Sequence, residues 1–326
     1  MSSIASSLLP NLQTLTDGLA SVLRSNGSTN NEATILRRHP NIYASSFPSE
    51  IVTCRVDDGS ELRLFCKYAA GHSHSGYGHR GGVAYETAVY RHLLQPSQAT
   101  TPTFYGAYTD ISTGATWLIL EHLDKTLRVS HTPEPAASMN LAARWIGRFH
   151  GTTKEHFSYA PMPFLHRYDA EYYLGWARRS SLFTGHWHER FPWLATLCER
   201  FEEIVVLLLA APPAHIHGEY YTSNILFRNG IVYPVDWESA AIAAGEIDLA
   251  SLTEGWPAEI VRQCQLEYQR ARWPEGSPAD FERTLAAARL YLHFRWLGDR
   301  PEWTAPDSHL WRFEELRSAG AQLGVI

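Results

Sequence analysis

Two neighbouring segments place acids and an amide at a spacing that suits phosphoryl transfer: HGEYYTSNIL at residues 217–226 and VDWE at 235–238. Asn224 comes five residues after Glu219, and Asp236 comes twelve residues after Asn224. An Asn-Gly turn between apolar runs predicts a hairpin there, which would bring the amide and the second acid together. Their oxygens would suit Mg²⁺. The remaining carboxylate would orient or deprotonate an attacking hydroxyl.

This compound motif resembles the aminoglycoside phosphotransferase and choline kinase family, whose pattern is H-G-D-x-x-x-x-N, a strand pair, and an aspartate before an aromatic residue. GEIDLA at 245–250 resembles a further segment of the family. The resemblance implies an α+β, two-lobed protein kinase-like fold over nearly the whole chain. It also implies a small-molecule kinase that uses ATP and Mg²⁺. It assigns His217 and Glu219 to catalysis, and Asn224 and Asp236 to the metal.

One position departs from the family pattern, because Glu219 stands where the family has aspartate. The extra methylene moves the carboxylate by about one bond length, and a misplacement of about 1 Å can cost about a hundredfold in rate. Either the surrounding backbone has adapted, or activity is weak or absent. Since Asn224, Asp236, Lys67 and Glu86 are all present, we favour an adapted kinase. A non-catalytic nucleotide-binding protein on the same fold is the alternative.

A lysine at the end of the third strand contacts nucleotide phosphates on a kinase-like fold and pairs with a glutamate of the next helix. Lys67 ends the strand predicted at 61–68. Glu86 lies on the apolar stripe of the helix predicted at 83–94, where a carboxylate is costly unless it is paired. Phe65 shares the face of Lys67 by strand alternation, so it is either an adenine contact or a core residue.

Two further segments carry expectations for the nucleotide. LILEHL at 118–123 resembles the linker between kinase lobes, where the Glu121 carbonyl and the Leu123 N–H would bond the adenine edge. Ser45 and Ser46, in the hairpin after the first predicted strand, would donate to phosphates as serine loops do in this family. A plain turn is the other interpretation of that hairpin.

Other nucleotide chemistries fit less well. A literal G-x-G-x-x-G occurs at 76–81, but its glycines begin well after the preceding strand and no βαβ series surrounds them, which disfavours a dinucleotide site. The sequence has no G-x-x-x-x-G-K-[ST] motif. It also lacks an H-R-D loop and a D-F-G to A-P-E segment, so protein kinase activity is a weaker hypothesis.

The predicted elements separate into a strand-rich first third and a helical remainder, which favours an α+β class over alternating βαβ units. Strands are predicted at 33–38, 50–56, 61–68, 103–109, 116–121, 224–227 and 231–235, and helices at 6–24, 83–94, 138–150, 167–180, 194–211 and through most of the rest. We expect three parts: an N-terminal helix and loop at 1–32, a nucleotide-binding lobe at 33–123, and a helical lobe with the catalytic loop and substrate site at 124–326.

Composition limits the partners. The chain has 326 residues, 44% of them hydrophobic and 19% charged, with a net charge of −6, which is ordinary for a globular protein. No basic block indicates a nucleic-acid partner. Four cysteines without C-x-x-C spacing indicate reduced thiols and a cytoplasmic location. The first residues do not have the basic and apolar pattern of a secretory signal, so we expect none, and no apolar run is long enough to span a bilayer. The acceptor, the choice between ATP and GTP, and the oligomeric state stay open.

Overall fold

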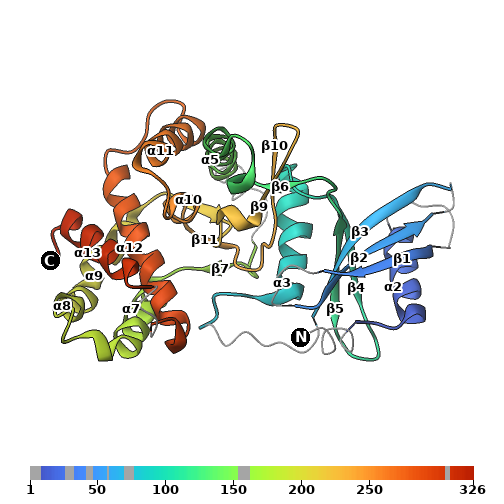
Figure 1. Cartoon of the computed structure of the whole chain (residues 1–326), viewed down its shortest axis with the longest axis horizontal. Helices are drawn as coiled ribbons and strands as arrows, with labels where there is room; N and C mark the ends of the chain where they lie inside the picture. Colours follow the sequence, from blue (N-terminus) through green and yellow to red (C-terminus); the bar gives the residue numbers. More distant parts are fainter. Residues whose placement is uncertain are drawn as a thin grey trace. The chain divides into compact units, whose positions relative to one another are not determined.

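The fold is described from a computed structural model that covers residues 9–25, 33–41, 47–56, 59–69, 77–152, 162–304 and 309–326. Internal contacts divide the chain into two units, whose elements are labelled in Figure 1. Unit 1 comprises Met1–Thr126 and Tyr233–Ser239, and unit 2 comprises Leu127–Val232 and Ala240–Ile326. The short segment that contains Asp236 therefore belongs with the N-terminal unit, although it lies late in the sequence.

Unit 1 is built on a five-stranded antiparallel sheet with the strand order β1-β2-β3-β5-β4. Consecutive strands pair as hairpins except where α3 and its continuation separate β3 from β4. The elements are α2 (Leu12–Ser25), β1 (Thr34–Pro40), β2 (Ser49–Arg55), β3 (Glu61–Tyr68), α3 (Gly82–Val89), the π-helix η1 (Tyr90–Leu94), α4 (Gln95–Ser97), β4 (Phe104–Thr109) and β5 (Thr116–Glu121).

The apolar stripe of α2 explains why this helix forms and where it packs. Leu15 and Leu19 are fully buried against one face of the sheet, in a core that includes Leu64 and Cys66 of β3. Because side chains alternate along a strand, Lys67 of β3 belongs to the opposite face. That face is where α3 lies, and the lysine is buried there.

Unit 2 is mainly helical, with two small three-stranded sheets ordered β10-β9-β6 and β7-β11-β8. Its elements are β6 (Leu127–Arg128), η2 (Val129–His131), α5 (Pro135–Gly151), β7 (His166–Arg167), α7 (Ala170–Phe183), η3 (Gly185–Trp187), α8 (Trp193–Glu199), α9 (Phe201–Ala210), β8 (Pro213–Ile216), η4 (Thr222–Asn224), β9 (Ile225–Arg228), β10 (Ile231–Pro234, which crosses the unit boundary), β11 (Ala241–Ala244), α10 (Glu246–Thr253), α11 (Ala258–Arg272), α12 (Phe281–Asp299), η5 (Pro301–Trp303) and α13 (Trp311–Leu323).

Local sequence explains several of these boundaries. Pro135 occupies the first turn of α5, where its missing N–H costs nothing. Asp169 caps α7 by accepting a hydrogen bond from the Tyr172 N–H at 2.8 Å. The turn between β9 and β10 uses Asn229 and Gly230, both with positive φ, as a two-residue hairpin of the predicted kind requires.

The α+β class predicted from the sequence is confirmed. The strands β6, β7, β8 and β11 were not predicted, and Arg167 of β7 had been assigned to a helix. The helix expected at 194–211 is two helices, α8 and α9, which meet at Arg200, where the backbone leaves helical geometry. The Arg200 guanidinium donates to the Val325 carbonyl at 2.7 Å. Helices were expected through most of the region after 235, whereas β11 is a buried strand that pairs with β8. A four-residue run of alanine and isoleucine has no alternating pattern that would distinguish it from a helix.

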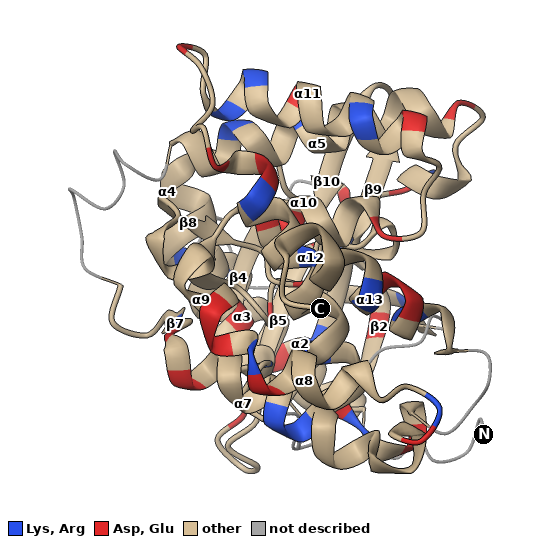
Figure 2. Ribbon diagram, turned by 90° about the vertical axis from the view of Figure 1, so that its left-hand side faces the viewer, with Lys and Arg blue, Asp and Glu red and all other residues tan. Residues whose placement is uncertain are grey.

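The surface of unit 2 carries both signs of charge. Acidic and basic positions alternate along α11, for example Glu259 with Arg262 and Glu267 with Arg270 (Figure 2). Among the helices of the described residues, none combines the length and the apolar character needed to cross a bilayer. All four cysteines carry free thiols.

Candidate active site

The first cluster of predicted site residues surrounds Lys67 in unit 1. Its ammonium group lies 2.8 Å from Glu86 Oε2 and 2.6 Å from Asp236 Oδ1, with Glu238 Oε2 at 3.7 Å. The side chains of Lys67, Glu86 and Glu238 are at most 5% exposed, whereas that of Asp236 is 39% exposed. Asp236 is therefore the carboxylate of the cluster that solvent reaches best.

Charge controls the protonation of this lysine. Burial alone would lower the pKa of Lys67, but Asp236, Glu86 and Glu238 outweigh burial and raise its pKa well above the ordinary value. The lysine is therefore a fixed cation. Arg80 Nε lies 3.6 Å from Glu238 Oε1, so two cations face three carboxylates. The formal charge of the cluster is one negative, which a bound cation would offset.

Backbone contacts hold the segment of Asp236 on α3. The Trp237 N–H donates to Glu86 Oε1 at 3.1 Å, so the two oxygens of Glu86 join Lys67 to the 233–239 segment. Asp236 itself has a φ of +67°, a left-handed conformation that is uncommon for a residue other than glycine. Strained backbone of this kind concentrates at functional sites.

The predicted adenine contacts lie at the end of β5. The Glu121 N–H donates to the Thr103 carbonyl at 2.8 Å, and its side chain accepts from Thr103 as well. Leu123 is buried, and no described residue accepts a hydrogen bond from its N–H. Phe65 is half-buried on β3, opposite Leu120 of β5. The two serines predicted to contact phosphates, Ser45 and Ser46, lie outside the described residues.

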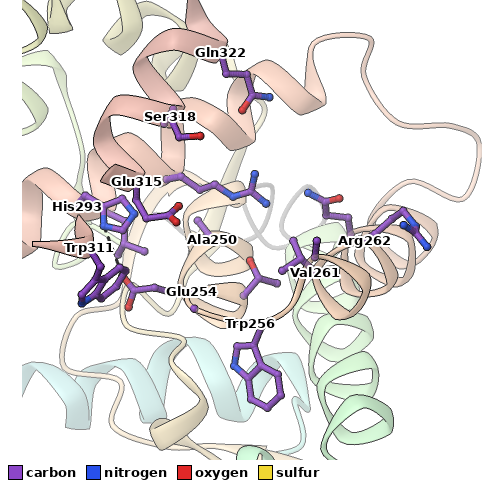
Figure 3. Close-up of a pocket in the computed structure, with 17 residues that line it drawn as sticks. Ala250, Glu254, Trp256, Val261, Arg262, His293, Trp311, Glu315, Ser318 and Gln322 are labelled. Carbon is purple, nitrogen blue, oxygen red and sulfur yellow. Dashed lines mark ion pairs between the residues drawn. The ribbon is translucent and has the colours of Figure 1, made fainter. Parts of the chain in front are cut away.

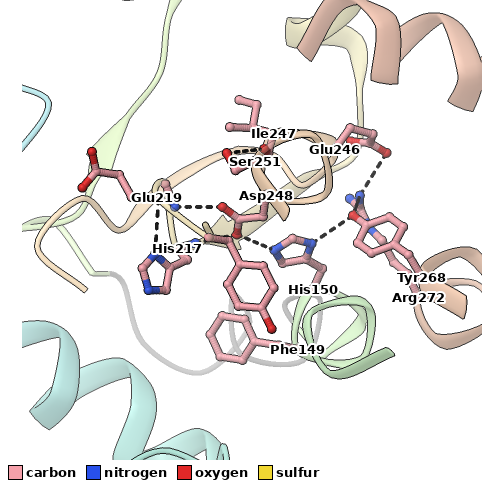
Figure 4. A network of polar contacts seen from close by, with 12 residues as sticks. Phe149, His150, His217, Glu219, Glu246, Ile247, Asp248, Ser251, Tyr268 and Arg272 are labelled. Carbon is pink, nitrogen blue, oxygen red and sulfur yellow. Dashed lines mark hydrogen bonds and ion pairs between the residues drawn. The ribbon is translucent and has the colours of Figure 1, made fainter. Parts of the chain in front are cut away.

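The second cluster is the loop that follows β8 in unit 2. Gly218 has a φ of +82°, a conformation that a residue with a Cβ rarely adopts. The carboxylate of Asp248, at the start of α10, accepts from the His217 N–H at 2.6 Å and from the Gly218 N–H at 2.9 Å. Two charge-assisted bonds thus fix the backbone immediately before Glu219 (Figure 4).

Asp248 is in turn held by a buried polar network (Figure 4). His150 Nε2 lies 3.2 Å from Asp248 Oδ2, and His150 Nδ1 lies 2.9 Å from the Tyr268 hydroxyl. The Arg272 guanidinium donates to that hydroxyl at 2.6 Å and to Glu246 at 3.0 Å. Burial lowers the pKa of His150, opposed by Asp248, so the imidazole is neutral at physiological pH. The network anchors the loop from the side away from Glu219.

Glu219 has a cationic partner that the motif did not predict. Its Oε1 accepts from Arg295 of α12 at 3.2 Å, and the two residues are 6% and 3% exposed. Arg295 also donates to the Tyr221 hydroxyl, and Trp296 Nε1 donates to the same hydroxyl at 2.9 Å. The carboxylate at the base position is therefore an oriented half of a buried ion pair.

Asn224 completes this cluster. Its side-chain Nδ2 donates to the Glu219 carbonyl at 3.0 Å, and its Oδ1 accepts from the Ser223 hydroxyl at 3.5 Å. An amide oxygen has two lone pairs, so it can still serve as a metal ligand. Asn224 belongs to unit 2 and Asp236 to unit 1, so the predicted site residues form two clusters, one in each unit.

Several residues of these clusters were missed at the sequence level. Arg295 could have been found from the sequence, because it lies within the apolar run LYLHFRWL. An arginine in a helix that is buried on all sides needs a partner for its charge. Glu238 directly follows Trp237 and had no spacing that singled it out. His150 carried no signal, since a histidine near the end of an amphipathic helix is ordinary.

Comparison with known proteins identifies the family. A model of the phosphotransferase enzyme family matches residues 79–284, more than half of the chain. No curated protein sequence matches the chain at a significant level.

Solved structures establish the fold. The chain is similar to a choline kinase from Cryptosporidium parvum Iowa II, with 14% identity, a TM-score of 0.62, and coverage of 94% of this chain and 97% of that one. It is also similar to a putative fructosamine-3-kinase from Haemophilus somnus 129PT (15%, 0.57, 93% and 96%). A third similar structure is the GDP complex of wild-type aminoglycoside 2′-phosphotransferase-IIIa (12%, 0.55, 93% and 98%).

These findings confirm both the family and the protein kinase-like fold that the motifs predicted. The chain belongs to the phosphotransferase enzyme family, the aminoglycoside phosphotransferase and choline kinase group, and is a small-molecule kinase.

Proposed function

We propose that this chain transfers the γ-phosphoryl group of ATP to a hydroxyl of a small molecule, with Mg²⁺ as the metal. In this proposal, unit 1 binds the nucleotide and unit 2 supplies the catalytic loop and the acceptor site. The observation that carries it is the buried Lys67 cluster, in which one ammonium is held between Glu86 at 2.8 Å and Asp236 at 2.6 Å. Kinases need such a fixed cation at the nucleotide phosphates.

Each residue has a separate task. Lys67, oriented by Glu86, contacts the nucleotide phosphates. The Glu121 carbonyl and the Leu123 N–H bond the adenine edge, Phe65 packs on the ring, and the loop of Ser45 and Ser46 donates to the phosphates. Glu219 orients or deprotonates the acceptor hydroxyl, and His217 supports it: its Nδ1 lies 3.3 Å from the Glu219 backbone nitrogen, which donates to it.

We propose Asp236 and Asn224, one from each unit, as the residues that hold Mg²⁺. Asp236 offers the most exposed carboxylate of a cluster with excess negative charge, and Asn224 offers an amide oxygen. Oxygen ligands of this kind, few in number and combined with substrate phosphates, are what Mg²⁺ prefers. The metal, when bound, neutralises charge on the phosphates.

The first experiment is an ATP-consumption screen with Mg²⁺ against aminoglycosides, macrolides, amino alcohols, sugars and nucleosides, repeated with GTP. Asp236→Ala should abolish turnover while the melting temperature without ligand changes little, because the side chain is partly exposed. Asp17→Ala, an exposed acid on α2, is the matched control and should keep full turnover. Turnover retained in Asp236→Ala would refute the metal assignment.

A second function is favoured by one observation, the glutamate at the base position and its ion pair with Arg295. A non-catalytic nucleotide-binding protein would be stabilised against heat by ATP and would transfer no phosphate to any acceptor. Glu219→Asp separates the two hypotheses. In an adapted kinase the shorter side chain loses its reach and turnover falls by about a hundredfold, whereas in a binding protein it changes neither stabilisation nor turnover.

The location that goes with this function is the cytoplasm. ATP is available there, and the four free thiols are stable in a reducing compartment.

A further inference from the structure

The guanidinium of Arg312 lies inside an aromatic cage in unit 2. Its central carbon is 4.3 Å from the ring centre of Trp296 on α12 and 4.2 Å from that of Trp311 on α13. It donates to Glu254 Oε1 at 2.6 Å and to His293 Nδ1 at 3.2 Å. Arg312 is only 7% exposed, so the cage is closed around it.

Two indole faces and a carboxylate are the groups with which proteins bind organic ammonium ions. In this chain the cation in that position is covalently part of the protein. His293 accepts the second bond as a neutral imidazole, because burial, together with Arg312 and Arg289, lowers its pKa to about 3. The cage therefore has its charge satisfied without a ligand.

The cage is linked to the proposed catalytic carboxylate through a chain of hydrogen-bonded side chains. Trp296 donates its indole N–H to the Tyr221 hydroxyl at 2.9 Å, and the same hydroxyl accepts from Arg295, the partner of Glu219. One indole, one phenol and one guanidinium thus separate Arg312 from the base position. The cage and the base position therefore belong to one connected network of side chains in unit 2.

A pocket adjoins the cage on its other side. Its volume is about 510 Å³, within the range of small-molecule sites. Glu254, His293 and Trp311 lie together at one end of this pocket, and Arg262 lies at the other end (Figure 3). Since Arg312 contacts the same three residues and does not line the pocket, its side chain fills the space behind that end.

We propose that Arg312 is an internal plug of a cation site, and that the acceptor of this kinase is consequently an alcohol without a cationic group, such as a sugar. The acceptor class rests on the proposed function, whereas the plug does not. A quaternary ammonium or a protonated amine would meet a guanidinium where the cage would otherwise receive it, and like charges repel. The similarity to a choline kinase and to an aminoglycoside phosphotransferase would then extend to the fold and not to the acceptor.

The plug is tested by binding, with tetramethylammonium as the probe and isothermal titration as the readout. Arg312→Ala should bind the probe at least tenfold more tightly than the unsubstituted protein. Adding Glu254→Gln should remove that gain, because the carboxylate supplies the attraction. Arg300→Ala is the matched control: Arg300 also stacks on an indole, that of Trp303 at 5.3 Å, but it is 52% exposed and closes no cage.

Two measurements keep the proposal refutable if Arg312→Ala fails to fold. Arg312→Met fills the cage with uncharged atoms and should not bind the probe. The unsubstituted protein should not bind it either, and tight binding there would overturn the plug.

The acceptor class is tested on the unsubstituted protein with ATP, Mg²⁺ and a panel of neutral sugars, choline and kanamycin. Phosphorylation of a sugar and not of the two cations supports the inference. Phosphorylation of choline or kanamycin would uphold the proposed function and overturn the inference. Turnover of none of a broad set of alcohols would refute the proposed function, and the acceptor class with it.

Discussion

Removing Arg295 should expose how much the protein depends on neutralising Glu219. The two charged atoms are 3.2 Å apart and almost fully buried. With an effective dielectric constant of about 20, their attraction is about 5 kcal/mol. Arg295→Met keeps a side chain of similar length but leaves an uncompensated buried carboxylate. Loss of one partner of a buried pair costs about 3–5 kcal/mol in the free energy of unfolding.

The double variant isolates the interaction. Arg295→Met leaves the charge of Glu219 without a partner, and Glu219→Gln removes that charge. The double variant should therefore be more stable, by about 2 kcal/mol, than the sum of the two single effects predicts. The assay is urea unfolding followed by far-ultraviolet circular dichroism, with ATP turnover measured in parallel. Turnover should fall in both single variants, because each disturbs the carboxylate that we propose orients the acceptor.

The matched control is a salt bridge of shorter distance on the surface of the same unit. Arg178 and Glu171 are 2.7 Å apart, but their side chains are 60% and 67% exposed, so Arg178→Met should cost less than about 1 kcal/mol. If Arg295→Met costs no more than this control, the reasoning from burial is wrong and Glu219 has another source of compensation.

Three further predictions concern the anchoring of the loop and the cage. A Cβ on Gly245 would lie 2.5 Å from His150 Nδ1 and 2.7 Å from the Tyr268 hydroxyl, so Gly245→Ala should lower the free energy of unfolding by about 1–3 kcal/mol. Gly185→Ala is the control: a Cβ there would have nothing within 4 Å, so the free energy of unfolding should change by less than about 0.5 kcal/mol. Asp248→Asn converts one of the two acceptors of the loop N–H groups into a donor; turnover should fall at least tenfold, and turnover unchanged in a folded variant would show that the loop needs no such anchor. The pKa of His293 is about 3 in the folded protein and about 6.5 in the unfolded chain. Between these values the unfolded state binds more protons, so the free energy of unfolding falls as the pH falls below about 6.5, by about 2 kcal/mol at pH 5. His293→Gln should remove this loss, whereas His186→Gln, at an exposed histidine, should not.

The sequence predicted most of unit 1 because its patterns are strong. Strand alternation around Lys67 and the apolar stripe that carries Glu86 are both periodic signals, and the structure has these two side chains 2.8 Å apart. The core of α2 against the sheet follows from its leucine spacing in the same way.

Unit 2 was less predictable for physical reasons. The buried strand β11 has no polar alternation because both of its faces are covered. The partners of Glu219 and Asp248 come from helices 76 and 98 residues away in the chain, and no local pattern predicts which buried cation or imidazole will meet which carboxylate. A charged residue within a buried helix predicts that a partner exists without identifying it.

The two clusters differ in charge, and under the proposed function this difference suits them to different ligands. Around Lys67 three carboxylates face two cations, Lys67 and Arg80, which leaves one negative charge that a bound divalent cation would offset. Around Glu219 the charge is already balanced by Arg295, and in the adjoining cage Arg312 balances Glu254. A charged acceptor would disturb that balance, whereas an uncharged alcohol could hydrogen-bond to the carboxylate and pack on the indole faces without doing so. Under the proposed function, the nucleotide and its metal would carry the charge that the reaction requires, and the acceptor would be selected by shape and hydrogen bonding.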